Sequence, residues 1–278
     1  MKKILIPVDF SEHSEYALEV ASTLAKENNA SLVVLHMMGL SESVLTKDES
    51  QEMFEAIYYM KLTEKRFNNF LDRDFLEGIP IETTVQNYKE FHEINNVAKD
   101  FDVDLIVMGS HGASGLKEVF VGSNTEKVVR TADVPVLVVK NQIKKLEVSK
   151  VVFACDFNLD FIIPFKNAWN FFKSMDVDFQ LVFINLPNKF ISSQEMEERA
   201  LKFVMHTGID ETKVLEKISY HSDYSLEDGI FSFCNKVHAD LVIIPTHGRR
   251  GLAHFFSENI GESLVNHADL PVMTFKVS

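Results

Sequence analysis

The chain has 278 residues, of which 46% are hydrophobic and 25% are charged, and its formal net charge at pH 7 is −13. This length suits two domains, at about 150 residues each, and the acidic balance excludes broad binding to nucleic acid or to an anionic membrane. The two cysteines, Cys155 and Cys234, exclude a disulfide framework and a four-cysteine zinc site.

Strands are predicted along the first half at residues 4–8, 31–37, 81–86, 105–108 and 136–139. The first, fourth and fifth of these segments are almost wholly apolar, which is typical of parallel strands covered by helices on both faces.

Helical patterns lie between these strands. Ser11 is placed to cap a first helix, whose apolar face repeats at spacings of three and four with Ala17, Val20, Ala21, Leu24 and Ala25. A longer second helix is indicated by Met53, Ile57, Met60, Leu62 and Phe67, and helices at 91–98 and 125–130 follow. Alternating strands and helices predict a parallel, doubly wound sheet.

The chain also repeats itself. Residues 104–112 return as 240–248, an offset of 136, and residues 4–11 return as 151–158 at an offset of 147. The second set of strands is predicted at 151–155, 180–184, 214–219, 241–244 and 272–275. We therefore expect an α/β fold of two tandem, Rossmann-like five-stranded parallel sheets flanked by helices: a domain at 1–140, a linker at 141–148 and a second domain at 149–278.

Glycines cluster after the fourth strand, where ligands bind in such sheets. Gly109, Gly112 and Gly122-Ser123 form the spacing Gly-x2-Gly-x9-Gly-Ser, which lets backbone amides and a helix start approach a phosphate. The spacing is neither a Walker A loop nor the dinucleotide Gly-x-Gly-x-x-Gly. The alternative is that these glycines shape a turn and that Ser123 caps a helix.

Asp9 follows the first strand, in the segment Pro7-Val8-Asp9-Phe10-Ser11. Its carboxylate could hold a ribose hydroxyl or a base amine, or it could help to start the helix that follows.

Taken together, residues 3–11, 35–36 and 108–112, the Gly122-Ser123 turn and residues 134–139 resemble the universal stress protein family over the whole chain, as a tandem pair. The resemblance implies the adenine nucleotide alpha hydrolase-like fold and the ATP-binding branch of the family. Asp9 would contact the adenosine, Met37 and Met108 would line the adenine pocket, and His111 and Asn124 would lie near the phosphates. The implied site comprises Pro7, Val8, Asp9, Met37, Met108, Gly109, His111, Gly112, Gly122, Ser123 and Asn124. Met37 and Met108 could instead fill core.

The second copy departs from this pattern. At offset 136 the four motif positions carry Pro245, Gly248, Glu258 and Asn259. Proline removes an amide donor and Glu258 places a carboxylate where a phosphate would sit, so we expect no ATP in this half.

These features predict a cytoplasmic, nucleotide-responsive regulator of stress adaptation that binds ATP, ADP or AMP, with Mg²⁺ held only through the phosphates. Binding would order residues 112–122 and bias contacts with an unknown protein partner. In this family the fifth strand commonly pairs protomers, so the resemblance implies that residues 136–139 pair with 272–275 as an intramolecular pseudo-dimer; the alternative is drift after duplication with no shared interface. A further homodimer is left open. No signal peptide, membrane span, metal site or catalytic residue is expected. The alternatives are a slow ATPase or phosphoryl-transfer enzyme at the same site, and a nucleotide-free scaffold or apolar-ligand binder.

Overall fold

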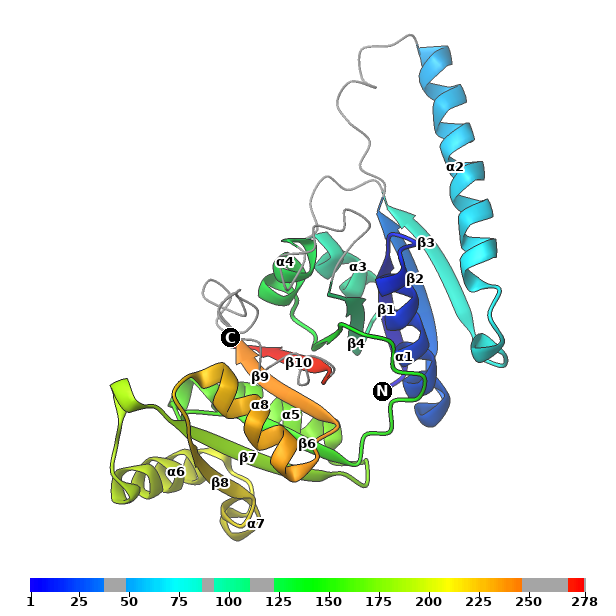
Figure 1. Cartoon of the computed structure of the whole chain (residues 1–278). Helices are drawn as coiled ribbons and strands as arrows, with labels where there is room; N and C mark the ends of the chain where they lie inside the picture. The colour runs from blue at the N-terminus through cyan, green and yellow to red at the C-terminus, as the bar shows by residue number, and fades with distance from the viewer. Residues whose placement is uncertain (38–48, 87–92, 111–122, 247–269, 278) are drawn as a thin grey trace.

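The computed structural model describes residues 1–37, 49–86, 93–110, 123–246 and 270–277 (Figure 1). The strands of the N-terminal half are β1 (Lys3–Val8), β2 (Ser31–Met37), β3 (Ile81–Gln86), β4 (Leu105–Gly109) and β5 (Val136–Val139). Those of the C-terminal half are β6 (Lys150–Ala154), β7 (Asp178–Asn185), β8 (Ile218–Ser222), β9 (Leu241–Thr246) and β10 (Val272–Lys276). The helices are α1 (Glu12–Asn28), α2 (Glu49–Leu71), α3 (Ile94–Asp100), α4 (Ser123–Thr131), α5 (Ile162–Phe172), α6 (Ser193–Thr207), α7 (Glu211–Leu215) and α8 (Leu226–Val237).

All ten strands form one sheet in the order β3-β2-β1-β4-β5-β10-β9-β6-β7-β8. Within each half, neighbouring strands are parallel, as the apolar sequences of the strands predict. The two halves join through β5 and β10, which pair antiparallel with Leu137 opposite Met273. The expected pairing of 136–139 with 272–275 is therefore present, and the five-stranded sheets of the two halves are continuous.

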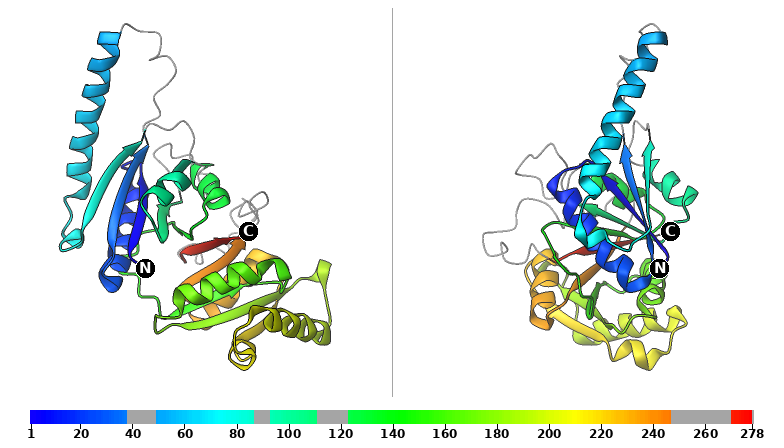
Figure 2. Two further views of the ribbon diagram at one scale, coloured as in Figure 1. Left: turned by 180° about the vertical axis from the view of Figure 1, so that it is seen from behind. Right: turned by 90° about the vertical axis from the view of Figure 1, so that its right-hand side faces the viewer.

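Helices cover both faces of this sheet (Figure 2). Buried side chains of α1, α5, α6 and α7 and of the last turns of α2 pack on one face, and those of α3, α4 and α8 pack on the other. This two-sided burial explains why β1 and β4 are apolar at almost every position. No helix in the described part of the chain is both long and apolar enough to cross a membrane.

The start of α1 follows its sequence closely. The Ser11 hydroxyl accepts a hydrogen bond from the backbone N–H of Ser14 and so caps the helix, as predicted. The apolar stripe that includes Ala17, Ala21 and Leu24 is buried. The helix ends at Asn29, which adopts a left-handed conformation and donates its N–H to the carbonyl of Ala25.

An aspartate at the start of the fourth strand of each half repeats one structural device. Asp104 Oδ2 accepts hydrogen bonds from the backbone N–H groups of Lys2 (2.5 Å) and Lys3 (3.0 Å). Asp240 Oδ2 accepts from those of Ser149 (2.9 Å) and Lys150 (2.8 Å). Both carboxylates therefore hold the start of a central strand, which supports the repeat read from the sequence.

The predicted strand at 214–219 is wrong at its start. Val214 lies in α7, because the Asp210 side chain accepts from the N–H of Thr212 (3.1 Å) and begins a helix there. Val214 is buried as a helical core residue, and the strand β8 begins only at Ile218. A buried valine is compatible with either structure, so the apolar pattern alone could not separate them.

The predicted second helix is present as α2, but its apolar positions differ in burial. Phe67 is buried, whereas the side chains of Ile57 and Met60 are exposed. In Figure 1 the first part of α2 extends past the carboxyl ends of β2 and β3. The amphipathic pattern therefore continues beyond the part of the sheet that the helix covers.

Beside the β5–β10 pairing, an ion-pair cluster joins the two halves. Asp133, just before β5, accepts hydrogen bonds from Asn95 Nδ2 (2.9 Å), Lys99 Nζ (2.8 Å) and Lys276 Nζ of β10 (3.0 Å). The hydrogen bond from Asn95 and the two ammonium groups hold the pKa of the Asp133 carboxyl well below its usual range.

We expect Asp133→Asn to destabilise the protein at neutral pH and to matter less in acid. A carboxyl whose pKa is lowered by folding contributes stability above its unfolded pKa of about 3.9, and loses it as the pH falls through the folded pKa. Because the side chain is 47% exposed, solvent screening limits the neutral-pH effect to about 1 kcal/mol or less. Urea unfolding of the unchanged protein and the variant between pH 7 and pH 2 measures the difference in their free energies of unfolding. A difference that stays as large below about pH 4 as at pH 7 would contradict the lowered pKa of Asp133.

Candidate functional site

The carboxyl ends of three strands of the N-terminal half meet at one edge of the sheet. β1 pairs with β2 with Val8 opposite His36, and with β4 with Leu5 opposite Ile106. Residues directly after or at these ends, Asp9, Met37 and Gly109, therefore reach the same edge. Such an edge is where open α/β sheets bind ligands.

Asp9 is tied to the start of α1. Its Oδ1 accepts hydrogen bonds from the hydroxyl of Ser14 (2.6 Å) and from the backbone N–H of Ser11 (3.1 Å). The N–H of Asp9 in turn donates to Ser14 Oγ (3.1 Å). This network fixes the carboxylate at the edge of the sheet, so the structural role considered for Asp9, at the start of α1, is present.

Phe10 is a feature of this edge that the sequence reading missed. Its backbone has φ +64°, a left-handed conformation that is costly for a residue with a side chain. The centroid of its ring lies 4.6 Å from that of the His36 ring. It lies 5.3 Å and 5.6 Å from the ring centroids of Phe67 and Phe70 of α2. His36 also makes a 2.8 Å hydrogen bond through Nδ1 to the carbonyl of Val8. The turn after β1 is thus locked by aromatic packing, and His36 is a packed strand residue.

Gly109 is required by the approach of α1. A Cβ atom at this position would lie 2.6 Å from the carbonyl oxygen and 2.8 Å from the carbonyl carbon of His13. The Gly109 carbonyl accepts a 2.8 Å hydrogen bond from the buried Thr125 hydroxyl, which holds the first turn of α4 against the end of β4. The missing side chain therefore admits the N-terminus of α1, and the backbone carbonyl of the same residue holds the N-terminus of α4, so both helix starts meet at the end of one strand.

The remaining predicted residues divide into two groups. Met108 is buried within β4, Met37 is half-buried at the end of β2, and Asn124 is half-buried in the first turn of α4. Pro7 and Val8 are buried at the end of β1. His111, Gly112 and Gly122 lie outside the described residues, as does the side chain of Ser123. The described part of the predicted site therefore consists of the residues at the strand ends and the first turn of α4.

The equivalent edge of the C-terminal half keeps the turn and changes the strand end. Phe157, the counterpart of Phe10, has φ +58°, and Asp156 Oδ1 accepts from the N–H of Asn158 (2.9 Å). Pro245, the counterpart of Gly109, is the fifth residue of β9. The counterparts Gly248, Glu258 and Asn259 lie outside the described residues.

A second polar cluster, which the sequence analysis did not predict, lies at the end of β8. His221 Nε2 is 3.0 Å from Ser232 Oγ and 3.8 Å from Asp223 Oδ2, and the same hydroxyl is 3.1 Å from that carboxylate. In a catalytic serine triad the hydroxyl and the carboxylate contact opposite ring nitrogens. Here the hydroxyl and the carboxylate both approach Nε2 of His221, so the cluster lacks the geometry of a catalytic triad. Its role is to connect α8 to the end of β8.

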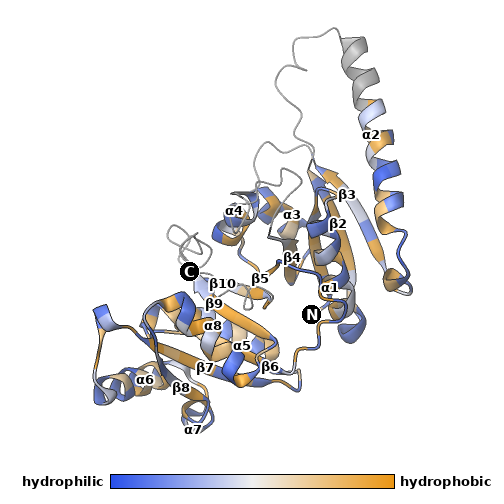
Figure 3. Cartoon of the chain, in the orientation of Figure 1, coloured by the Kyte–Doolittle hydropathy of each residue, from blue (hydrophilic) through white to orange (hydrophobic). Residues whose placement is uncertain are grey.

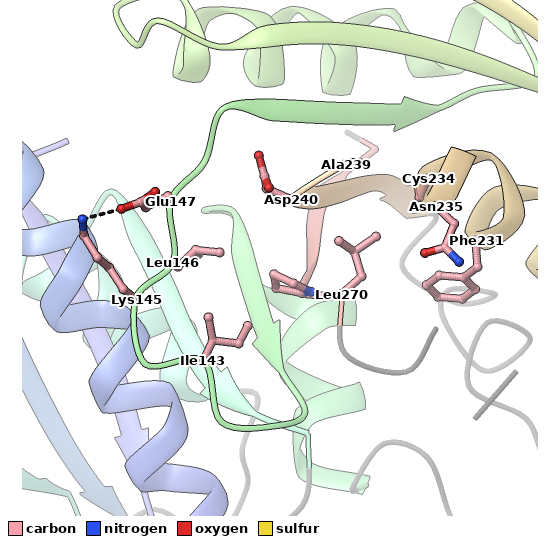
Figure 4. A pocket seen from close by; sticks show the side chains of 11 residues that line it. Ile143, Lys145, Leu146, Glu147, Phe231, Cys234, Asn235, Ala239, Asp240 and Leu270 are labelled. Atoms are coloured by element: carbon pink, nitrogen blue, oxygen red, sulfur yellow. Dashed lines mark hydrogen bonds and ion pairs between the residues drawn. The ribbon is translucent and has the colours of Figure 1, made fainter. Parts of the chain in front are cut away.

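Two hollows lie away from the strand-end site. One, of about 430 Å³, is bordered by Leu146 of the linker, Phe231 of α8 and Leu270 (Figure 4). It contains the ion pair of Lys145 and Glu147 and adjoins the amino ends of β9 and β10. Another, of about 290 Å³, lies on the seam between the halves. Burial raises the pKa of the Cys234 thiol to about 12, so the cysteine beside the first hollow is a protonated, unreactive thiol at neutral pH.

Comparison with known proteins gives a consistent result. The sequence model of the universal stress protein family matches residues 1–140 and 196–276. The universal stress protein MJ0577 of Methanocaldococcus jannaschii is 35% identical over 155 residues, covering 51% of this chain and 96% of that protein. YxiE of Bacillus subtilis, also a universal stress protein, is 36% identical over 146 residues, covering 50% and 98%. A universal stress protein structure from Archaeoglobus fulgidus DSM 4304 superposes with a TM-score of 0.59 at 19% identity, over 99% of this chain and 96% of that one; this last likeness concerns the fold.

Proposed function

The chain belongs to the universal stress protein family, and from that premise we propose that its N-terminal half binds one adenine nucleotide, as ATP, ADP or AMP, at the carboxyl edge of β1, β2 and β4. The observation that carries the proposal is the position of Gly109. It ends β4 on the same edge as Asp9 and Met37, and it begins the unbroken Gly-x2-Gly-x9-Gly-Ser spacing.

The described residues at this edge fit such a ligand. The N-terminus of α4, held by Thr125 against Gly109, offers amide groups and the positive end of a helix dipole for phosphate. Asp9, held by Ser11 and Ser14, offers a fixed carboxylate for the ribose. Met37 offers a half-buried apolar surface for the base. Mg²⁺ would enter only with the phosphates.

In this proposal the C-terminal half binds no nucleotide, because Pro245 removes an amide donor and Glu258 adds negative charge. The domains are residues 1–140 and 149–278 with a linker at 141–148, and they form an intramolecular pseudo-dimer across β5 and β10. The protein acts in the cytoplasm as a regulator of stress adaptation, with nucleotide occupancy biasing its contacts with a protein partner.

Nucleotide stoichiometry tests the proposal. We expect calorimetric titration of nucleotide-stripped protein with ATP and Mg²⁺ to show one site per chain. Gly122→Glu should abolish binding, because its carboxylate repels the phosphates, and Glu258→Ala should leave the single site unchanged. Circular dichroism checks that both variants are folded.

Two sites per chain would refute the assignment of the C-terminal half, and no site with ATP, ADP or AMP would refute the nucleotide proposal. ATP turnover that disappears in Gly122→Glu would replace a binding role with an enzymatic one.

A further inference from the structure

One turn of α2, residues 57–60, carries apolar and aromatic side chains on every side, and all four are exposed in the described part of the structure. The exposed fractions are 42% for Ile57, 65% for Tyr58, 43% for Tyr59 and 63% for Met60. Four consecutive residues of an α-helix point in all directions around its axis. Their shared exposure therefore means that this turn stands clear of the sheet, as Figures 1 and 3 show.

The exposed turn continues a face that is buried further along the helix. Phe70, Phe67 and Thr63 are buried at spacings of three and four, and the next step along the same face is Met60. The face is covered by the body of the protein up to Thr63 and uncovered from Met60. Since each residue advances about 100° around the helix axis, Tyr59 and Tyr58 lie about 100° and 200° from Met60, and both are exposed as well. The open apolar surface therefore includes the side of the turn that points away from the buried face, and contiguous apolar surface of this kind marks an interaction site.

The charges of α2 indicate what covers it. Within the sequence of α2, the acidic residues Glu49, Glu52 and Glu55 precede the apolar turn. Lys61, Lys65 and Arg66 follow it, and Glu64 is the single acidic residue between the turn and the end of the helix. At a rise of about 1.5 Å per residue, positions 52 and 65 lie at nearly equal distances on either side of the turn. The helix is therefore complementary in charge to a copy of itself that runs in the opposite direction.

We propose that α2 is a homodimer interface, in which the helices of two chains pack antiparallel across a two-fold axis at residues 58 and 59. The axis makes the contact self-complementary: the apolar turns cover one another, and the acidic segment of each helix faces the basic segment of the other. This interface is separate from β5 and β10, which already pair within one chain, and it does not depend on nucleotide binding.

A lone helix offers a competing explanation of the charges, because acidic residues near the N-terminus and basic residues near the C-terminus also suit the helix dipole. The dipole, however, requires no apolar turn between the two segments. The two explanations also differ in what they predict for mixtures of variants, and this difference decides the experiment.

The test uses two charge variants of the full-length chain. Lys61→Glu/Lys65→Glu makes both ends of α2 acidic, and Glu52→Lys/Glu55→Lys makes both ends basic. We expect sedimentation velocity to show a concentration-dependent dimer for the unchanged protein and a dissociation constant raised at least about tenfold in each variant alone, since like charges then oppose. Mixing the two variants should restore the dimer as a heterodimer.

The apolar part of the interface is tested separately. Tyr58→Glu should raise the dissociation constant at least about tenfold, whereas Tyr224→Glu, at a tyrosine of the C-terminal half that is 91% exposed, should leave it unchanged. Tyr58→Cys should form a disulfide-linked dimer under mild oxidation. The native Cys155 and Cys234 add little background, because burial raises the pKa of both thiols.

A monomer at every concentration would overturn the proposal, as would a dimer that Tyr58→Glu does not weaken. Failure of the mixed charge variants to associate would overturn the antiparallel arrangement. Circular dichroism and urea unfolding of each variant separate a lost interface from a lost helix.

Discussion

Replacing Phe165 with alanine is expected to lower the free energy of unfolding by about 3–5 kcal/mol. Phe165 lies on α5, and its side chain is fully buried. Its ring lies 5.5 Å from those of Phe153 and Phe203, in edge-on contacts, and 5.8 Å from Trp169. Alanine would remove one member of an aromatic cluster that joins the central strand of the C-terminal half to two helices, and would leave a cavity that close-packed neighbours cannot fill.

Urea unfolding followed by circular dichroism measures this loss. The matched control is Phe190→Ala, the same substitution at a side chain that is 71% exposed, where we expect a change within about 0.5 kcal/mol. Similar losses at both positions would show that the aromatic cluster does not hold this half together.

Gly109→Ala is expected to destabilise the protein by about 1–3 kcal/mol, as overpacking does. The new methyl carbon would meet the carbonyl group of His13 at 2.6 Å and 2.8 Å. Because these atoms belong to the backbone of α1, no rotation of a side chain relieves the contact, and the helix must move away from β4. If the proposed nucleotide site is correct, affinity for ATP should fall with stability, since the same movement displaces the carboxyl edge that holds Asp9.

Two further variants identify the cause. His13→Ala combined with Gly109→Ala should restore little stability, because the two nearest atoms remain. Gly78→Ala should cost about 1 kcal/mol for a different reason: Gly78 has φ +80°, and nothing lies within 4 Å of its added Cβ. Full tolerance of Gly109→Ala in thermal unfolding would contradict the close packing of α1 on β4.

Much of this fold could be predicted because the limits of its strands and the start of α1 are set by residues that are neighbours in sequence. Strands β2, β3 and β5 begin and end where the predicted apolar or β-branched runs do, and Ser11 caps α1 through its own neighbours. The error at Val214 arose where a buried valine fits both a helix and a strand. The exposure of Met60 could not be foreseen, because the pattern of α2 does not reveal where the sheet beneath it ends.

Part of the arrangement at the strand ends also followed from the sequence. The strand ends and the glycine spacing placed Asp9 and Gly109 on one edge, and the resemblance to universal stress proteins added Met37. The need for glycine at position 109 arises from a contact with His13, which is far away in sequence. The left-handed conformation of Phe10 depends on packing against α2, which is also distant in sequence. Only the repeated phenylalanine at positions 10 and 157 could have drawn attention to that turn.

The antiparallel joint between β5 and β10 has a consequence for how the two copies could diverge. Since the strands of the two halves run in opposite directions, their carboxyl ends open on opposite margins of the sheet. The strand end at Gly109 and its counterpart at Pro245 therefore lie on different margins of one continuous sheet. A ligand at one margin has no direct contact with the strand ends of the other, so the two copies can differ in their motif residues without sharing a binding surface.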